Sequence, residues 1–317
     1  MQSSITRRQF LERTACASAL LMATRRGEAA TGMYVSLNGT LVNKPKEPLP
    51  WADFVRLAGR LGYGGVDVNL GAARKDGVEA TRALLAEAKV KPAIAGLPLQ
   101  FATPDEDAFQ EGVKGLAEGA KFLDAIGCHQ VMAVMSPGSP VPREERRAFV
   151  KARLAPIAEI LGNSNIRLGL EFLGPLHFRT PSERAPHQFI WTLPETVALG
   201  AEIAPNVGAV LDIWHWHHSG GTAADIHAAG KARIVHIHAS DARAQPPEEV
   251  RDNQRLMPGE GIIDHVTFYQ ALGKIGYEGG ISPEPIGRIP AEMSPEDGAR
   301  LGLETTLAVM KKAGVVG

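Results

Sequence analysis

Residues 207–239 read VGAVLDIWHWHHSGGTAADIHAAGKARIVHIHA. Two short apolar runs in this stretch, Val207–Ile213 and Ile234–Ala239, have the length and composition of buried β-strands. A short helix is predicted between them, near Ala223–Ala229. An apolar strand, a helix and a second apolar strand are typical of two parallel strands that are joined by a crossover helix and buried on both faces.

The same strand–helix pattern recurs along the whole chain. Strands are predicted at residues 34–37, 66–70, 91–97, 130–135, 167–172, 207–213, 234–239 and 280–285. The helices that follow them are predicted at about residues 50–61, 77–88, 106–126, 143–161, 194–203, 223–229, 266–275 and 295–313. This repetition predicts an α/β protein, a single-domain (β/α)8 TIM barrel over residues 31–317. The alternative, a doubly wound open sheet, often has a glycine-rich phosphate turn after its first strand, and Tyr34–Gly39 contains none.

Composition and charge exclude several other classes of protein. The 317 residues include 34 Lys and Arg and 35 Asp and Glu, so the formal net charge is −1, and 44% of the residues are hydrophobic. These are ordinary globular values, which exclude a disordered chain, a collagen and a coiled coil. A charge near zero argues against a nucleic-acid partner. The two cysteines, Cys16 and Cys128, are too few for a disulfide framework or a thiolate zinc site.

The first thirty residues have the pattern of an export signal peptide. Arg7 and Arg8 form a basic start, an apolar run covers residues 15–23, and small residues follow at 29–32. The paired arginines, followed by Gln-Phe-Leu, resemble a twin-arginine signal, which implies export of a folded protein to the periplasm or beyond. The apolar run is shorter than the roughly 20 residues that span a bilayer, and no membrane span is expected. The alternative is a basic, frayed N-terminal helix.

Polar residues stand at the ends of four successive predicted strands. Glu171, Asp212, His238 and Glu284 each close such a strand, and the C-terminal ends of barrel strands form the active face. A carboxylate in an apolar strand must be paired, protonated or bound to a metal, and none of the three has a lysine or arginine beside it on its own strand. A single glutamate or aspartate at a strand end would more often be a surface carboxylate. The set of four predicts a metal site.

The expected cofactor is one divalent metal ion bound by these four residues. Three crowded carboxylates repel one another, and a divalent cation relieves this repulsion. Three oxygens and one imidazole suit Mn²⁺ best, with Mg²⁺, Co²⁺ and Fe²⁺ as alternatives. Zn²⁺ stays an option, although it more often gathers additional His or Cys ligands.

The motifs around these residues resemble a known family. The chain contains Glu171, Asp212-x-x-His215, His238-x-x-Asp241, the run PGEGIID at residues 258–264, and Gly276-Tyr277-x-Gly279-Gly280-Ile281-Ser282-x-Glu284. Their order is similar to that of the xylose-isomerase-like TIM-barrel superfamily, in its sugar phosphate isomerase/epimerase branch. This resemblance covers residues 167–284 in detail, and the strand count fits the mature chain.

The resemblance implies roles for individual residues. Glu171, Asp212, His238 and Glu284 match the metal ligands of the family, and Glu171 and Glu284 match its catalytic acid–base pair. His215 matches a substrate-binding histidine. Arg243 lies near the position of the family's substrate arginine, although its offset is not a clean match.

Three neighbouring residues keep simpler interpretations as well. His236 shares a strand face with His238 and is expected to fill the barrel interior as a hydrogen-bonded core residue. Asp241 is expected to cap a helix or to support a ligand. Trp214 has two equal interpretations, packing in the core or forming a wall of a sugar pocket.

The expected function is that of a metal-dependent isomerase or epimerase. It would abstract a proton next to a carbonyl of a sugar, cyclitol or keto-sugar and pass through an enediolate. The alternative is a keto-sugar dehydratase or keto-glycoside lyase, because the same abstraction can expel a β-substituent. Export favours a carbohydrate substrate without phosphate. The oligomeric state stays open, a homo-oligomer included.

Two further alternatives carry less weight. An AP endonuclease needs a multi-zinc cluster with histidines from earlier strands, and the ends of the third and fourth predicted strands, at Leu97 and Met135, offer none. A non-catalytic sugar-binding barrel would be favoured by the loss of a ligand position, and all four positions are filled.

Overall fold

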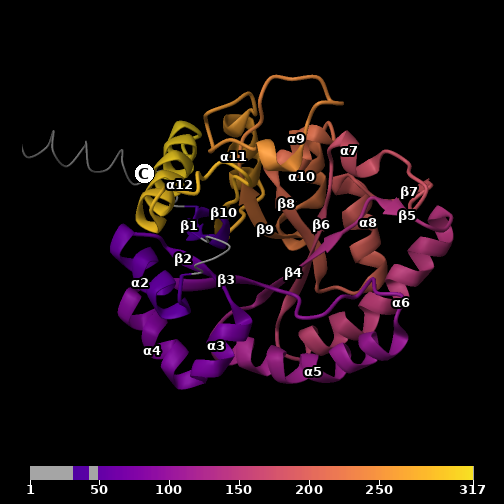
Figure 1. Ribbon diagram of the computed structural model, residues 1–317, viewed down its shortest axis with the longest axis horizontal. Helices are drawn as coiled ribbons and strands as arrows, with labels where there is room; N and C mark the ends of the chain where they lie inside the picture. The colour runs from indigo at the N-terminus through magenta and orange to yellow at the C-terminus, as the bar shows by residue number, and fades with distance from the viewer. Residues whose placement is uncertain (1–30, 43–48, 317) are drawn as a thin grey trace, which may run out of the picture.

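The protein is a closed barrel of eight parallel strands with helices around its outside (Figure 1). The computed structural model describes residues 31–42 and 49–316. The strand order around the barrel is β1-β10-β9-β8-β6-β4-β3-β2, and β1 pairs with both β10 and β2, so the sheet has no free edge. The (β/α)8 prediction is therefore confirmed. The predicted export signal, residues 1–30, lies outside the described residues.

The barrel strands are short. They are β1 (Met33–Leu37), β2 (Gly65–Val68), β3 (Lys91–Gly96), β4 (Gln130–Met135), β6 (Arg167–Phe172), β8 (Val207–Asp212), β9 (Ile234–Ala239) and β10 (Gly279–Pro283). The outer helices are α2 (Trp51–Leu61), α3 (Leu70–Asp76), α4 (Val78–Ala88), α5 (Glu106–Ala125), α6 (Arg143–Gly162), α8 (Leu193–Ile203), α10 (Ala223–Ala229), α11 (His265–Lys274) and α12 (Pro295–Lys312).

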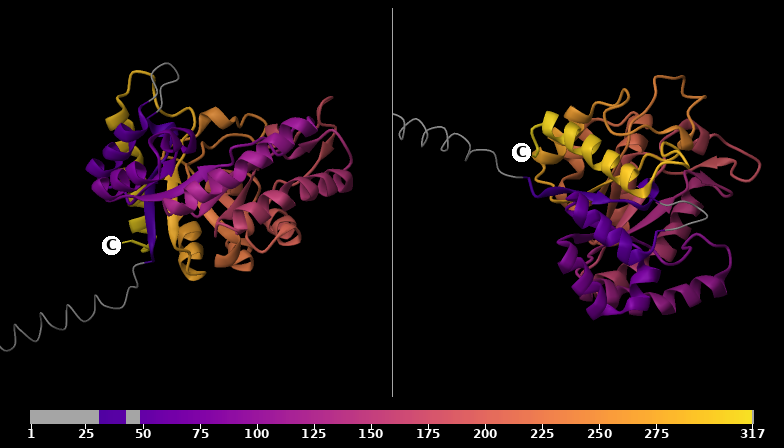
Figure 2. Two further views of the ribbon diagram at one scale, coloured as in Figure 1. Left: turned by 90° about the horizontal axis from the view of Figure 1, so that it is seen from below. Right: turned by 60° about the vertical axis from the view of Figure 1, so that its left-hand side comes forward.

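Smaller elements lie in the connections. They are α7 (Leu176–Arg179), α9 (Ile213–His218), the 3₁₀ turns η1 (Gly39–Leu41), η2 (Lys231–Arg233) and η3 (Asp252–Gln254), and a two-stranded antiparallel pair of β5 (Gly138–Ser139) and β7 (His187–Gln188). The last helix, α12, packs against β1 and α2, so the two ends of the described chain meet (Figures 1 and 2). Within the described ranges, no helix combines the length and the apolar character needed to cross a bilayer.

Helix caps explain where strand ends differ from those predicted. The second strand was expected to reach Leu70, but it ends at Val68, because the Asn69 side chain accepts the N–H of Ala72 and starts α3. In the same way, Asp212 accepts the N–H of Trp214 and starts α9 where the strand was expected to continue. Both side chains satisfy N–H groups that the first helical turn leaves free.

Two neighbouring strands, β8 and β9, are buried along their whole length, and β8 requires glycine at one position. All six residues of β8 and of β9 are buried. A Cβ atom built on Gly208, in β8, would collide with the backbone carbonyl of Arg233, which precedes β9. Backbone atoms in a closed barrel have little room to move, so this position needs glycine.

We expect Gly208→Ala to destabilise the fold by about 1–3 kcal/mol through this overpacking. The matched control is Gly115→Ala, because Gly115 is an exposed glycine of α5 whose added Cβ would meet no atom within 4 Å. That control should gain about 0.5–1 kcal/mol through helix propensity. Urea unfolding measures both changes. Equal stabilities for the two variants would contradict the packing argument.

Candidate metal centre at the mouth of the barrel

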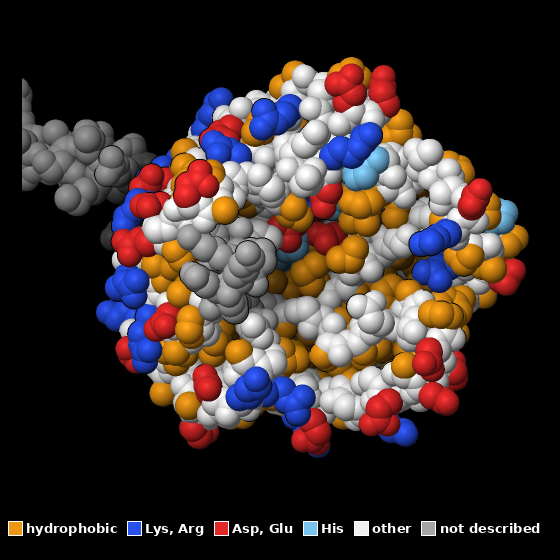
Figure 3. Space-filling view, viewed as in Figure 1, with side chains coloured by type: hydrophobic (Ala, Val, Ile, Leu, Met, Phe, Trp, Pro, Cys, Tyr) orange, Lys and Arg blue, Asp and Glu red, His pale blue; other side chains and the backbone are white. Residues whose placement is uncertain are grey.

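The barrel brings the four predicted ligands together at one end. Each of Glu171, Asp212, His238 and Glu284 offers one atom, and these atoms all lie within 4.8 Å of one another. His238 Nδ1 lies 2.7 Å from Glu171 Oε1 and 3.5 Å from Glu284 Oε2. Figure 3 shows acidic and histidine side chains in the hollow at the middle of this face.

Burial makes the charges of this cluster costly. Asp212 is fully buried and Glu171 is only 4% exposed. Loss of solvation raises the pKa of Glu284 to about 7. Burial would lower the pKa of His238, but the Glu284 and Glu171 carboxylates outweigh it and raise that pKa to about 10. Without an added cation, the raised pKa values favour the protonated forms of Glu284 and His238.

Arg255 supplies one positive charge to the cluster. Its buried guanidinium donates from Nη1 to Asp212 Oδ2 at 2.7 Å and to Glu284 Oε2 at 3.1 Å. Nε and Nη2 donate to Asp252 Oδ1 at 2.9 and 2.8 Å. Sequence reasoning missed this residue, because it looked for basic partners only on the strands themselves. The available signal was its position, three residues before the PGEG motif.

These residues fit a divalent cation. Three carboxylates and one guanidinium leave two negative charges when His238 is neutral, and one divalent ion would cancel them. Ligand atoms around one ion at about 2.1 Å lie at most about 4.2 Å apart, so a small closure would bring all four into contact with it. Carboxylate and imidazole donors are also the types that Mn²⁺ and Zn²⁺ accept.

His215 lies beside the cluster, on α9. Its Nε2 is 3.2 Å from Arg255 Nη2 and 3.7 Å from Asp212 Oδ2. Burial lowers its pKa to about 3, so the ring is neutral and Nε2 accepts from the guanidinium. Nδ1 then carries the proton, and this buried atom has no hydrogen-bond partner in the described part of the chain. It can donate to a bound molecule.

Unlike these residues, Arg243 is not buried. It is exposed in the loop after β9, and its side chain makes no hydrogen bond or ion pair within residues 31–42 and 49–316. Its substrate contact stays a prediction. Arg255, from the same loop, is the arginine that the structure places against the ligand carboxylates.

A further carboxylate, the half-buried Asp67 of β2, lies next to His238. It accepts from Ser36 Oγ (2.9 Å), Ser282 Oγ (2.7 Å) and Asn38 Nδ2 (2.9 Å), and burial raises its pKa. His236 Nε2 lies 2.8 Å from the same Ser282 hydroxyl, so His236 is a hydrogen-bonded core residue. Sequence reasoning missed Asp67, because a lone Asp in a short strand carries no signal of the face it occupies.

Asp241 holds the loop that carries Arg255. Its carboxylate accepts the backbone N–H groups of Ala242, Gly259, Gly261 and Ile263 at 2.8–3.0 Å, and it lies 3.2 Å from His265 Nε2. Its backbone also pairs with Leu256, the residue after Arg255. These contacts fix the loop against the end of the barrel, and they therefore fix the position of the Arg255 guanidinium.

Comparisons with known proteins identify similar sequences and folds. The family model "Xylose isomerase-like TIM barrel" matches residues 55–311. An inosose isomerase of Halalkalibacterium halodurans is 26% identical over 226 residues, which are 70% of this chain and 76% of that protein. The structure of a xylose isomerase domain protein from Alicyclobacillus acidocaldarius has a TM-score of 0.79 at 28% identity and covers 89% of this chain and 99% of its own.

A third similar structure was solved with a metal. The IOLI protein with a bound zinc atom has a TM-score of 0.72 at 20% identity, and the match covers 89% of this chain and 99% of that chain. At this identity the likeness shows the fold alone.

The Asp241 carboxylate gives a pH test of the loop. Burial raises its pKa, but the hydrogen bonds from His265 and the backbone outweigh this and lower it. Its contribution to stability is therefore full above the unfolded pKa of about 3.9 and is lost as pH falls through the folded value. We expect Asp241→Asn to cost about 2 kcal/mol at pH 7, because an amide group would face backbone N–H donors, and less below about pH 4.

Urea unfolding between pH 3 and pH 7 measures this difference. Asp107→Asn is the control, because Asp107 is exposed in the first turn of α5. A constant gap between wild type and Asp241→Asn over this range would show that folding does not shift the pKa of this carboxyl.

Proposed function

The chain belongs to the xylose isomerase-like TIM barrel family, and we propose that it is a divalent-metal-dependent isomerase or epimerase of a sugar, cyclitol or keto-sugar. The observation that carries the proposal is the buried cluster of Glu171, Asp212, His238 and Glu284 at the barrel mouth. The similarity to inosose isomerase supports a substrate with a carbonyl beside hydroxyl-bearing carbons.

Mn²⁺ is our first choice of metal, and Zn²⁺ is the second because of the zinc atom in the IOLI structure. When bound, such an ion would polarise a substrate carbonyl and make the neighbouring C–H more acidic. We also propose that residues 1–30 direct the protein out of the cytoplasm.

Glu171 and Glu284 are the proposed proton carriers. They reach His238 Nδ1 from two different parts of the barrel, β6 and the residue after β10, at 2.7 and 3.5 Å. Two carboxylates placed around one substrate allow one to remove the proton and the other to return it. His215 would hold a substrate hydroxyl through its unpaired Nδ1–H. Arg243 is proposed as a further contact from the family resemblance alone.

Elimination of a β-substituent is the second candidate reaction. It starts with the same proton removal and ends with loss of a leaving group instead of proton return. A cavity with apolar walls beside the metal centre favours it, because a leaving group without phosphate would fit there.

The reaction is tested by following the α-proton in D₂O. We expect the Mn²⁺-loaded protein to exchange the proton next to the carbonyl of an inosose or a 3-keto-glucoside, followed by NMR. Glu171→Gln and Glu284→Gln should each lower the rate by about 10²–10⁴-fold, because the amide cannot take a proton. Glu304→Gln, at an exposed position of α12, is the matched control and should keep the rate. Exchange at the wild-type rate in both site variants would overturn the assignment.

Metal binding is tested separately from catalysis. We expect Mn²⁺ to stabilise the metal-stripped protein, by about 2.7 kcal/mol at a hundred times the Kd. Glu284→Gln should lose most of this gain, because it removes one ligand charge, whereas Glu304→Gln should keep it. Thermal unfolding with and without metal measures both. Metal binding without any proton exchange would favour a non-catalytic barrel, and no metal response at all would remove the basis of the proposal.

A further inference from the structure

A cavity of about 280 Å³ opens on the same face as the metal centre. Its lining residues come from the other half of the barrel, from β1 to β4 and the start of α2, whereas the metal ligands lie on β6, β8 and β9 and just after β10. Asp67 belongs to both places: it lines the cavity, and one of its oxygens lies within 4.8 Å of a His238 nitrogen. The cavity is therefore next to the metal centre and distinct from it.

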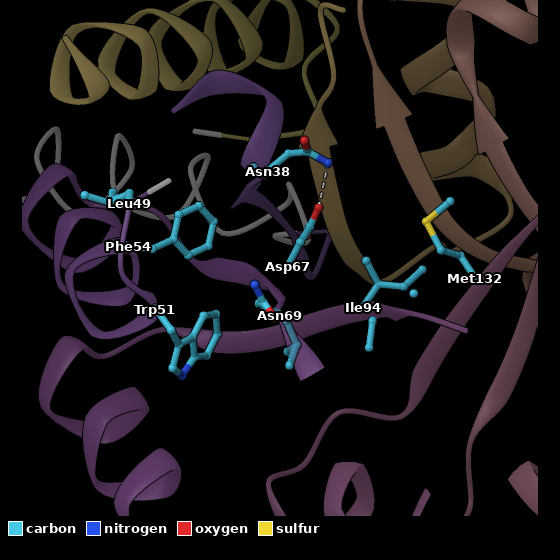
Figure 4. A pocket seen from close by; sticks show the side chains of 12 residues that line it. Asn38, Leu49, Trp51, Phe54, Asp67, Asn69, Ile94 and Met132 are labelled. Atoms are coloured by element: carbon cyan, nitrogen blue, oxygen red, sulfur yellow. Dashed lines mark hydrogen bonds between the residues drawn. The ribbon is translucent and has the colours of Figure 1, made fainter. Parts of the chain in front are cut away.

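One wall of the cavity is apolar. Trp51 and Phe54 pack against each other, with ring centroids 6.0 Å apart and an angle of 28° between the rings. Figure 4 shows them with Leu49 on one side, and Ile94 and Met132 on the opposite side. Such walls favour a flat or ring-shaped group with an apolar face, because aromatic rings pack well on C–H groups and other rings.

The described lining residues offer no positively charged side chain. Among them there is no lysine or arginine, and the one charged side chain is that of Asp67. Phosphate is normally bound by Arg or Lys side chains or by free backbone N–H groups. The Asn69 side chain already caps α3, which leaves its amide NH₂ as a neutral donor. The Asp67 carboxylate disfavours an anion, and the Asn69 amide can donate to a hydroxyl.

We propose that this cavity is the subsite for a second, uncharged ring, glycosyl or aryl, joined to the ring that reacts at the metal centre. The inference rests on the proposed function and narrows it: the substrate is a keto-glycoside, not a sugar phosphate or a bare inosose. The cavity volume of 280 Å³ equals about nine water molecules at roughly 30 Å³ each. This volume is sufficient for one ring. The position of the cavity agrees as well. Asp67 lines it and also lies beside His238, so the two sites are one residue apart.

Gly96 allows the cavity to be filled without breaking the fold. It is the last residue of β3, it lines the cavity, and a Cβ added there meets no atom within 4 Å. Gly96→Leu therefore projects a side chain into the open space. Gly115→Leu is the matched control, because Gly115 is exposed on α5 and has equally open surroundings.

The experiment compares substrates with and without a second ring. For the Mn²⁺-loaded wild type, we expect the KM for α-proton exchange of phenyl 3-keto-glucoside or 3-keto-cellobiose to be about tenfold or more below that of 3-keto-glucose. Gly96→Leu should remove this advantage and change kcat/KM for 3-keto-glucose by less than about twofold. Gly115→Leu should behave as wild type. The phenyl and glucosyl probes show which of the two rings the cavity prefers.

Two results would overturn the subsite. The first is a wild type that exchanges 3-keto-glucose as well as the two-ring probes. The second is equal loss for all probes in Gly96→Leu, because the cavity would then hold the reacting ring itself.

Failure of the proposed function can be told apart from failure of the subsite. If no probe exchanges, calorimetric binding of unreactive phenyl β-glucoside decides: binding that Gly96→Leu weakens about tenfold supports the subsite, and no binding overturns it.

Discussion

Closure of a parallel barrel forces three carboxylates into one small space. Glu171, Asp212 and Glu284 lie at the ends of different strands, but all parallel strands end on the same face, so their side chains meet at the mouth. The surrounding residues are arranged around this concentration of negative charge. His238 lies between two of the carboxylates, and Arg255 bridges Asp212 and Glu284. A divalent ion would complete the same balance.

The surroundings of each carboxylate decide its chemistry. Asp241 sits among backbone N–H groups that solvate its charge, and its pKa is lowered. Glu284 lies at the mouth of the barrel but is poorly solvated, and its pKa is raised. The first therefore serves as a fixed anchor for a loop, and the second is suited to exchange a proton or a cation. The same chemical group, a carboxylate, thus supports structure at one place and reactivity at another.

The fold and the clustering of four polar residues at the barrel mouth were predictable because both follow from local pattern. Apolar runs bounded by helices predicted β4, β6 and β9 to the residue, and the strand-end rule located Glu171, Asp212, His238 and Glu284. Arg255 was not predictable, because a long loop without periodicity gives no direction for its side chains. Asp67 was missed for a related reason: its hydrogen bonds to Ser36 and Ser282 join β2 to β1 and β10, and only the barrel register brings those residues together.

The division of the mouth into two halves has a consequence for how such a protein changes over time. The four proposed metal ligands occupy the β6–β10 half, and the cavity occupies the β1–β4 half, with Asp67 at the boundary. Mutations in the β1–β4 half can therefore reshape what the barrel accepts while the charges of the β6–β10 half stay in place. Substrate range and chemistry can diverge independently, and a chimera that exchanges the loops after β1, β2 and β3 would inherit its selectivity from one parent and its reaction from the other.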